Sequence, residues 1–284
     1  MGGSRFTVLG AGGFIGRHLA ARLRQAGHEV LTPGRGALGH LRDQPLGHVI
    51  YCIGLTADFR QRPLETVEAH VGVLGDLLRG ADLASLLYLS STRVYARAGD
   101  AREDALLPAS PRDPSDLYNL SKMMGEALCL NAGGPRARVV RLASVVGFDP
   151  LSQNFLPAIV RQALDGRIVL QSTLASAKNY IVLEDVLDLL PRIAEHGASD
   201  VYNVAGDRNV SHREIVDRLA ELTGCTVGVA PDAVEQAFPP IPIERIRREF
   251  GFRPRDPLAA LAPIVAAHRR HAAAPSGGPA RRDA

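Results

Sequence analysis

The sequence predicts a doubly wound α/β fold, in which helices cover both faces of a parallel sheet. Three observations lead to this prediction. A strand, a glycine turn, a helix and a second strand follow one another within the first 32 residues, and such a βαβ unit makes its strands parallel. Short apolar runs then alternate with helical segments as far as Gly147. A chain of 284 residues, 46% of them hydrophobic, can form one large domain or two closely joined ones.

The first βαβ unit can be followed residue by residue. An apolar strand is expected at 6–9, and Ile15, Leu19 and Leu23 follow with helical spacing. Gly27 stands where a helix C-cap belongs. The remaining elements of this half are expected as strands at 28–32, 48–54, 85–91 and 137–144, and as helices at 64–78 and 115–132.

The second half predicts a smaller substrate domain interleaved with the first. Ser211 and Glu214 form a capping-box pattern that starts a helix. The other elements expected here are helices at 154–166, 211–224 and 242–252, a strand at 167–172, and a strand end running into a helix at 180–197. We predict a cofactor-binding domain over 1–147 with parts of 178–206, a substrate domain over most of 148–270, and a disordered Pro-, Gly- and Ala-rich tail at 271–284.

Composition limits the possible partners and compartment. The net charge is only +3 and no basic stripe is present, so nucleic acid is not an expected partner. No apolar run is long enough to span a bilayer, and the N-terminus does not have the pattern of a signal peptide. Cys52, Cys129 and Cys225 have neither disulfide nor zinc spacing, which favours the cytoplasm. His268 and His271 lack a third ligand, so we expect a solvated helix face and no metal.

The segment "GAGGFIG" predicts a dinucleotide site. Gly10 permits a tight turn, Gly13 lets the backbone approach a pyrophosphate, and Gly16 lets the helix pack against the strand. The helix N-terminus at Phe14 and Ile15 offers N–H donors and the positive end of the helix dipole to the phosphates. Because the glycines follow a strand and open a helix, the context favours a dinucleotide over a purely structural turn.

The residues after the second strand favour NADP over NAD. NAD sites usually place an acidic residue there, which holds the ribose 2′-hydroxyl. This chain has no Asp or Glu between Val30 and Leu41. Arg35 stands where a cation could meet a 2′-phosphate, although a solvated arginine in a glycine-rich loop is the alternative. NAD therefore stays possible.

A serine, a tyrosine and a lysine form the candidate catalytic set. Ser91 and Thr92 follow an apolar strand, at the sheet edge where ligands bind in this fold. Tyr118 and Lys122 stand four residues apart and so share a helix face. A free tyrosine has a pKa of about 10, and a nearby ammonium lowers that pKa by stabilising the phenolate. Tyr118 could then exchange a proton with a substrate oxygen while Ser91 hydrogen-bonds the same oxygen. A solvated helix surface is the alternative.

The motifs "GAGGFIG", "SSTRVY" and "YNLSK" together resemble the extended short-chain dehydrogenase/reductases of the NAD-dependent epimerase/dehydratase family. The resemblance covers about residues 5–255. It implies that Ser91, Tyr118 and Lys122 are catalytic and that Lys122 also holds the nicotinamide ribose. It further implies that the segment "CIGL", with Ile53, Gly54 and Leu55 at its end, runs under the cofactor.

The resemblance also suggests substrate residues and shows departures from the family pattern. Thr92, Asn154 and Lys178 match substrate positions, the last two near the nucleotide diphosphate, although Asn154 is equally well explained as a helix N-cap. Lys122 and Lys178 are the only lysines beside 31 arginines, a coincidence that chance could also produce. His70 replaces a common asparagine. Thr92 and the following arginine replace the Asp-Glu pair of the family's dehydratases, so dehydration is not expected.

These observations predict an enzyme. The leading hypothesis is an NADP(H)-dependent reductase of a nucleotide-linked keto sugar, with Ser91, Tyr118 and Lys122 at its centre. The alternative is a nucleotide-sugar epimerase that retains NAD. A non-catalytic, cofactor-sensing protein is a third possibility, although such proteins usually lose the tyrosine or the lysine. The family pattern implies a homodimer formed through the helix that carries Tyr118.

Overall fold

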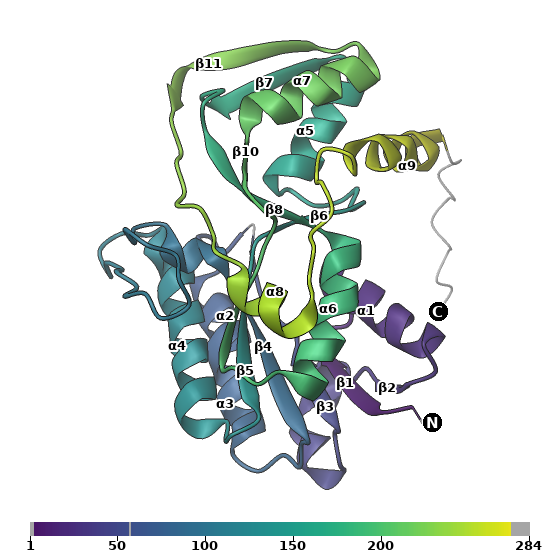
Figure 1. Ribbon diagram of the computed structural model, residues 1–284, viewed down its shortest axis with the longest axis vertical. Helices are drawn as coiled ribbons and strands as arrows, with labels where there is room; N and C mark the ends of the chain where they lie inside the picture. Colours follow the sequence, from purple (N-terminus) through teal and green to yellow (C-terminus); the bar gives the residue numbers. More distant parts are fainter. Residues whose placement is uncertain (1–2, 57, 274–284) are drawn as a thin grey trace, which may run out of the picture.

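The computed structural model describes residues 3–56 and 58–273. It has two lobes, shown in Figure 1, with a six-stranded sheet and its helices in the lower one and two small sheets in the upper one. Over the described residues, no helix is long and apolar enough to cross a membrane.

The lower lobe is built on a fully parallel sheet with the order β2-β1-β3-β4-β5-β9. The chain runs from β1 to β2 on one side and then crosses to β3 on the other, so the direction of winding reverses between β1 and β3. Ligands of such sheets bind at this reversal, outside the carboxyl ends of the strands. The strands are β1 (Arg5–Leu9), β2 (Glu29–Leu31), β3 (His48–Tyr51), β4 (Ser85–Ser91), β5 (Ala137–Leu142) and β9 (Val201–Val204).

Helices cover both faces of this sheet, as the sequence predicted. α1 (Phe14–Gln25) and α6 (Leu183–His196) lie on one face, and α4 (Asp116–Ala132) packs on the other against β4 and β5. The helix expected at 64–78 consists of α2 (Pro63–Val67), a π-helical turn η2 (Glu68–Gly72) and α3 (Val73–Leu78). Between β2 and β3 the chain forms a 3-10 helix, η1 (Arg35–Asp43). This short connection takes the place of a full helix and strand in the alternation of the fold.

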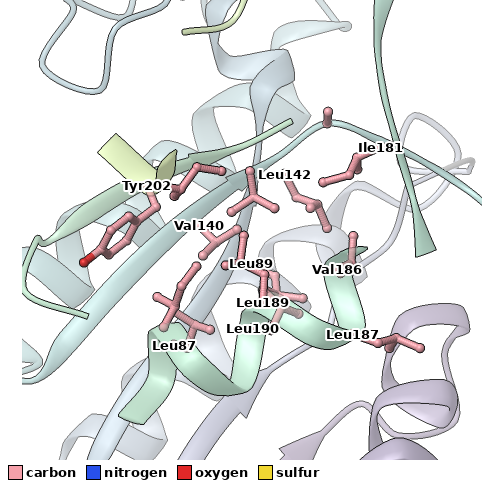
Figure 2. Packing of buried hydrophobic residues seen from close by; sticks show 14 of the residues in the cluster. Leu87, Leu89, Val140, Leu142, Ile181, Val186, Leu187, Leu189, Leu190 and Tyr202 are labelled. Atoms are coloured by element: carbon pink, nitrogen blue, oxygen red, sulfur yellow. The ribbon is translucent and has the colours of Figure 1, made fainter. Parts of the chain in front are cut away.

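The second half of the chain completes the core of the lower lobe. Figure 2 shows side chains of α6 packed against β4 and β5, among them Leu87, Leu89, Val140, Leu142, Val186, Leu189 and Leu190. β9 was not predicted, because a strand of four residues shows too little pattern. α8 (Glu244–Phe250) also returns to this core, where Ile243, Ile246 and Phe252 are buried.

The upper lobe has its own apolar core between two small sheets and three helices. A three-stranded sheet runs β10-β8-β6, and a parallel pair joins β11 to β7. The predicted capping box forms: the Ser211 hydroxyl accepts from the Glu214 N–H at 3.2 Å. The elements are β6 (Ser144–Val146), α5 (Phe155–Leu164), β7 (Arg167–Ser172), β8 (Ala177–Val182), β10 (Asn209–Ser211), α7 (His212–Thr223), β11 (Thr226–Val234) and α9 (Leu261–Ala273).

The C-terminal end corrects two expectations. Residues 271–273, expected in a disordered tail, belong to α9, and 274–284 lie outside the described residues. His268 does not lie on a solvated face: it is buried, with its ring 4.9 Å from that of Phe148. The sequence missed this burial because α9 packs against α5 and α7, which only the tertiary structure brings together.

Candidate active site

The glycine turn between β1 and α1 is shaped by backbone contacts that a side chain would block. Gly10 has φ +83°, and a Cβ there would lie 2.8 Å from the backbone of Cys52. A Cβ on Gly16 would lie 2.3 Å from the Gly10 carbonyl oxygen. Gly13 is the N-cap of α1 and forms no side-chain cap, so the first N–H groups of the helix, at Phe14 and Ile15, are free of a capping side chain. This cradle fits the pyrophosphate of a dinucleotide.

Arg35 lies at the start of η1, after the short segment 32–34 that follows β2, and its side chain is exposed. β2 neighbours β1 in the sheet, so this segment follows the strand next to the glycine turn. An exposed guanidinium at this place suits the 2′-phosphate of NADP.

The segment after β3 lies beside the candidate catalytic helix. Ile53, Gly54 and Leu55 follow β3, and a Cβ on Gly54 would lie 3.5 Å from Lys122 Nζ and 3.1 Å from His70 Nε2. The structure therefore brings the segment expected under the cofactor next to the lysine expected to hold its ribose.

Tyr118 lies in the first turn of α4, with only 6% of its surface exposed. Its ring is 5.4 Å from that of Phe59 and 5.3 Å from that of His70. Burial raises the pKa of Tyr118, while a hydrogen bond with Ser91 and the charge of Arg93 lower it in part. Ser91 ends β4, at the carboxyl edge of the sheet, and Thr92 begins η3 (Thr92–Tyr95) beside it. Ser91 therefore lies near Tyr118, and their joint catalytic role stays a prediction.

Lys122 lies one turn further along α4 and is buried. Its ammonium donates to the Leu89 carbonyl at 2.8 Å and lies 4.9 Å from the centre of the Tyr88 ring. Burial lowers the pKa of Lys122 to about 7, although the charge of Glu126 opposes that shift. The predicted influence of this ammonium on the phenol of Tyr118 stays a prediction.

His70 is fully buried at the π-helical turn and connects several parts of the site. Its Nε2 accepts from the Leu55 N–H at 3.3 Å, so its Nδ1 carries the proton and donates to the Ser121 hydroxyl at 2.8 Å. Ser121 in turn donates to the Tyr118 carbonyl at 2.9 Å. Burial, together with the charge of Lys122, lowers the pKa of His70 to about 2, so the ring is neutral.

A buried ion pair anchors α4 to the sheet beneath these residues. Arg141 of β5 and Glu126 of α4 meet at 2.7 Å, with side-chain exposures of 5% and 4%. Ser90 donates to the same carboxylate, and Arg141 also donates to the Tyr95 hydroxyl at 2.7 Å. No local pattern predicts this pair, because its members lie 15 residues apart on different elements.

A cavity of about 330 Å³ lies in the upper lobe. The rings of Phe155 and His212 stack there at 4.2 Å, and Lys178 Nζ lies 5.2 Å from the centre of the Phe155 ring. Asn154 is exposed at the N-cap of α5 and forms no side-chain cap bond. The cavity is lined by Phe155, Ala158, Ile159, Gln162, Val169, Leu170, Gln171, Ser172, Lys178, His212 and Gln236.

The charges of the cavity interact with the charge of Arg93, which lies over the Tyr118 ring of α4. Burial lowers the pKa of Lys178 to about 8, and the charge of Arg93 adds to that shift. Burial and the charge of Lys178 lower the pKa of His212 to about 4. Cationic groups therefore extend from the Tyr118 ring to the cavity, which suits an anionic ligand. In the part of the chain that is described, no group of three or more His, Cys, Asp or Glu residues could hold a metal ion.

Comparison with known proteins shows which family the chain resembles in sequence and in fold. The family model described as "NAD dependent epimerase/dehydratase family" matches residues 6–205. GDP-6-deoxy-D-mannose reductase of Pseudomonas aeruginosa is 28% identical over 262 residues, which cover 80% of this chain and 83% of the reductase. UDP-glucose 4-epimerase of Azospirillum brasilense is 26% identical over 310 residues, covering 88% and 87%. The structure of RMD from Pseudomonas aeruginosa complexed with NADPH superimposes with a TM-score of 0.79 at 24% identity, covering 94% of this chain and 99% of that one.

Proposed function

Since this chain belongs to the NAD-dependent epimerase/dehydratase family of nucleotide-sugar-modifying enzymes, we propose that it is an NADP(H)-dependent reductase of a nucleotide-linked keto sugar. The observation that carries the proposal is that Ser91, at the carboxyl end of β4, lies close enough to buried Tyr118 to lower its pKa, on the same sheet whose first strand ends in the glycine turn. A ketone oxygen held between these two hydroxyls would have both a hydrogen-bond donor and a proton donor.

Each residue of the site has its own role in ketone reduction. The nicotinamide, when bound, supplies the hydride. Ser91 donates a hydrogen bond to the ketone oxygen as negative charge develops there, and the Tyr118 hydroxyl gives that oxygen its proton. Lys122, whose ammonium lies beside Gly54, holds the ribose of the cofactor. The glycines at Gly10, Gly13 and Gly16 leave room for its pyrophosphate. Phe59 and His70 pack against the Tyr118 ring and exclude water from its buried side.

The residues expected to contact the adenosine end of the cofactor favour reduction over epimerisation. The chain has no acidic residue between Val30 and Leu41 and exposes Arg35 after β2, a combination that suits NADP. A reductase must release the oxidised cofactor and bind a reduced one after each turnover. An epimerase instead reduces its intermediate again with the cofactor that it has kept bound. The similarity to GDP-6-deoxy-D-mannose reductase supports the same choice, and the similarity to UDP-glucose 4-epimerase keeps epimerisation as the second candidate.

The nucleotide of the substrate would occupy the cavity of the upper lobe. The stacked rings of Phe155 and His212 offer an aromatic surface to a base, and Lys178 offers a cation to the diphosphate. Asn154 and Thr92 would contact the diphosphate and the sugar. Lys178 lines the cavity and is close enough to Arg93 for its pKa to be lowered by that charge, which fits a substrate that extends from the cavity to Tyr118.

A homodimer through α4 fits the surface of the lower lobe. Leu64 and Val67 of α2 and Met124 and Leu130 of α4 are exposed apolar side chains. α2 and α4 contact each other, so these side chains belong to neighbouring helices. Burying them against a second copy would remove them from water. Sedimentation velocity should therefore give the mass of two chains, and Met124→Glu should yield monomers.

The proposed function is tested with purified enzyme, NADPH and a panel of nucleotide-linked 4-keto sugars. We expect NADPH oxidation with product alcohol formed in equal amounts. Tyr118→Phe should abolish turnover and keep cofactor affinity, whereas Tyr202→Phe, which removes a phenol paired with Glu249 at 2.8 Å, should keep activity. Tightly bound NAD with interconversion of two sugars in the absence of added reductant would overturn the reductase in favour of the epimerase.

A further inference from the structure

Two arginines lie around one buried phenylalanine beside the candidate active site, and the proposed mechanism gives neither a role. Arg60 follows Phe59 in the segment between β3 and α2, and its guanidinium carbon is 4.5 Å from the centre of the Phe59 ring. Arg93 lies in η3, and its guanidinium carbon is 5.0 Å from the centre of the same ring. Arg60 donates to the Ser115 hydroxyl at 2.9 Å and Arg93 to the Ser115 carbonyl at 3.4 Å. Phe59 and Ser115 therefore hold two positive charges close together.

Neither of these guanidiniums is neutralised by a carboxylate. Over residues 3–56 and 58–273, no Asp or Glu side chain forms an ion pair with Arg60 or with Arg93. The acidic residues of the same segments are instead paired with other arginines: Asp58 with Arg62, and Asp113 and Asp116 with Arg97.

The two like charges act on each other. Burial lowers the pKa of Arg93, and the charge of Arg60 lowers it further. The charges of Asp116 and Asp113 oppose this shift with smaller effects than that of Arg60. Holding two guanidiniums together without a shared anion costs free energy, and an anion bound between them would remove that cost.

The two arginines lie where a substrate would pass. β3 and β4 are neighbouring parallel strands, so the segments that follow them, with Arg60 and Arg93, lie at the same carboxyl edge of the sheet. The guanidinium carbon of Arg93 is 5.5 Å from the centre of the Tyr118 ring. Its charge also acts on Lys178, which lines the cavity of the upper lobe. Arg60 is exposed and Arg93 is only partly buried, so a ligand can reach both.

We propose that Arg60 and Arg93 bind a carboxylate on the sugar of the substrate, so that the keto sugar is also a sugar acid. The inference rests on the proposed function and narrows its substrate class. Lys178, at the cavity, is the cation assigned to the diphosphate. The arginines lie at the other end of the path, next to the tyrosine that meets the ketone, so the anion that they meet belongs to the sugar and not to the nucleotide.

The chemistry of the guanidinium suits this ligand. Its planar fork of N–H donors matches the two oxygens of a carboxylate, and it stays charged at all working pH values. Stacking on Phe59 restricts both side chains before the ligand arrives, which lowers the entropy lost on binding. The carboxylate takes no part in the bond changes. The ketone carbon gains the hydride of the reduced nicotinamide and the ketone oxygen gains the proton of Tyr118, while the acid group only fixes the orientation of the sugar.

Binding of matched nucleotide sugars tests the proposal without turnover. The probes are pairs that differ only in the acid group: UDP-glucuronic acid and UDP-glucose, with the corresponding dTDP and GDP pairs. Calorimetry on the enzyme loaded with NADP gives a dissociation constant for each. For the nucleotide that binds best, we expect the acid to bind about tenfold more tightly than the neutral sugar, or better. Equal affinity for the acid and the neutral sugar in every pair overturns the proposal.

Substitution of the two arginines shows where the preference arises. Arg60→Met and Arg93→Met keep an aliphatic stem against Phe59, and each should remove most of the preference for the acid while the neutral sugar binds as before. Arg112→Met is the matched control, because it removes an exposed arginine from the loop before α4, and it should keep the preference. If Arg93→Met does not fold, Arg93→Gln gives the same comparison.

Two other outcomes would place the anion elsewhere and overturn the proposal. An equal loss of affinity for the acid and the neutral sugar in Arg60→Met and Arg93→Met would assign the arginines to the diphosphate. A loss of NADPH affinity by the same factor would assign them to the phosphates of the cofactor.

Activity separates this inference from the proposed function. An enzyme that prefers the acid in binding yet oxidises no NADPH with any keto sugar acid refutes the reductase and leaves the carboxylate site intact. An enzyme that reduces neutral keto sugars with the same kcat/KM as their acid counterparts overturns the carboxylate site and leaves the reductase intact.

Discussion

Replacing Lys122 by methionine should change how the stability of the protein depends on pH. Lys122 is buried, and burial lowers the pKa of its ammonium from 10.5 to about 7. In the unfolded chain this lysine keeps its proton up to about pH 10.5, whereas in the folded protein it releases the proton near pH 7. Between these values the unfolded state binds more protons, so the free energy of unfolding rises with pH.

The size of the effect follows from the same two pKa values. A difference between 10.5 and about 7 corresponds to about 5 kcal/mol at 1.36 kcal/mol per pH unit. The buried lysine destabilises the folded protein by this full amount below pH 7, and the destabilisation disappears as the pH approaches 10.5. Between pH 6 and pH 9 the wild type should therefore gain about 3 kcal/mol relative to Lys122→Met. Loss of the bond to the Leu89 carbonyl costs about 1–3 kcal/mol at every pH and does not alter this slope.

Urea unfolding of both proteins without cofactor, at pH 6, 7, 8 and 9, measures the difference. Arg24→Met is the matched control, because it removes a cation that lies exposed on the surface and not buried in the interior. The difference in free energy of unfolding between the wild type and Arg24→Met should stay constant with pH. The difference between the wild type and Lys122→Met should narrow or reverse as the pH rises. If that second difference were also constant, the folded protein would hold Lys122 with an ordinary pKa, and the reasoning would be wrong. The same variant should lose activity.

Three further changes have expected outcomes. Gly16→Ala would place a Cβ 2.3 Å from a backbone carbonyl and should abolish NADPH binding measured by fluorescence, whereas Gly12→Ala, with nothing within 4 Å, should keep it. Arg141→Met leaves the Glu126 carboxylate buried without its partner and should cost about 3–5 kcal/mol in urea unfolding. Adding Glu126→Gln to that variant should recover part of the loss, and additive losses would contradict the coupling. His70→Leu should cost about 1–3 kcal/mol by leaving a backbone N–H unpaired, and unchanged stability would refute that role.

The glycine turn and the parallel sheet could be predicted because their causes are local. A strand, three spaced glycines and a helix can be identified from neighbouring residues, and the turn around Gly10 forms as that pattern requires. The position of Ser91 at the carboxyl edge of the sheet could also be predicted, since the apolar run before it is a buried strand. The shape of helix 64–78 could not: the π-helical turn at Glu68–Gly72 depends on how His70 packs against Leu55 and Ser121.

The sequence by itself determined the fold class, the glycine cradle and the candidate catalytic set, because these follow from periodicity, turn chemistry and motif order. Only the tertiary structure decided which cation lies over the Tyr118 ring. Spacing predicts that Lys122 acts on the Tyr118 phenol from one helical turn away, and this stays a prediction. In the fold, Lys122 donates to the Leu89 carbonyl, and a 3-10 helix capped by Ser91 sets Arg93 over the phenol ring. Which charged groups lie around a buried side chain depends on distances between elements, which no local pattern encodes.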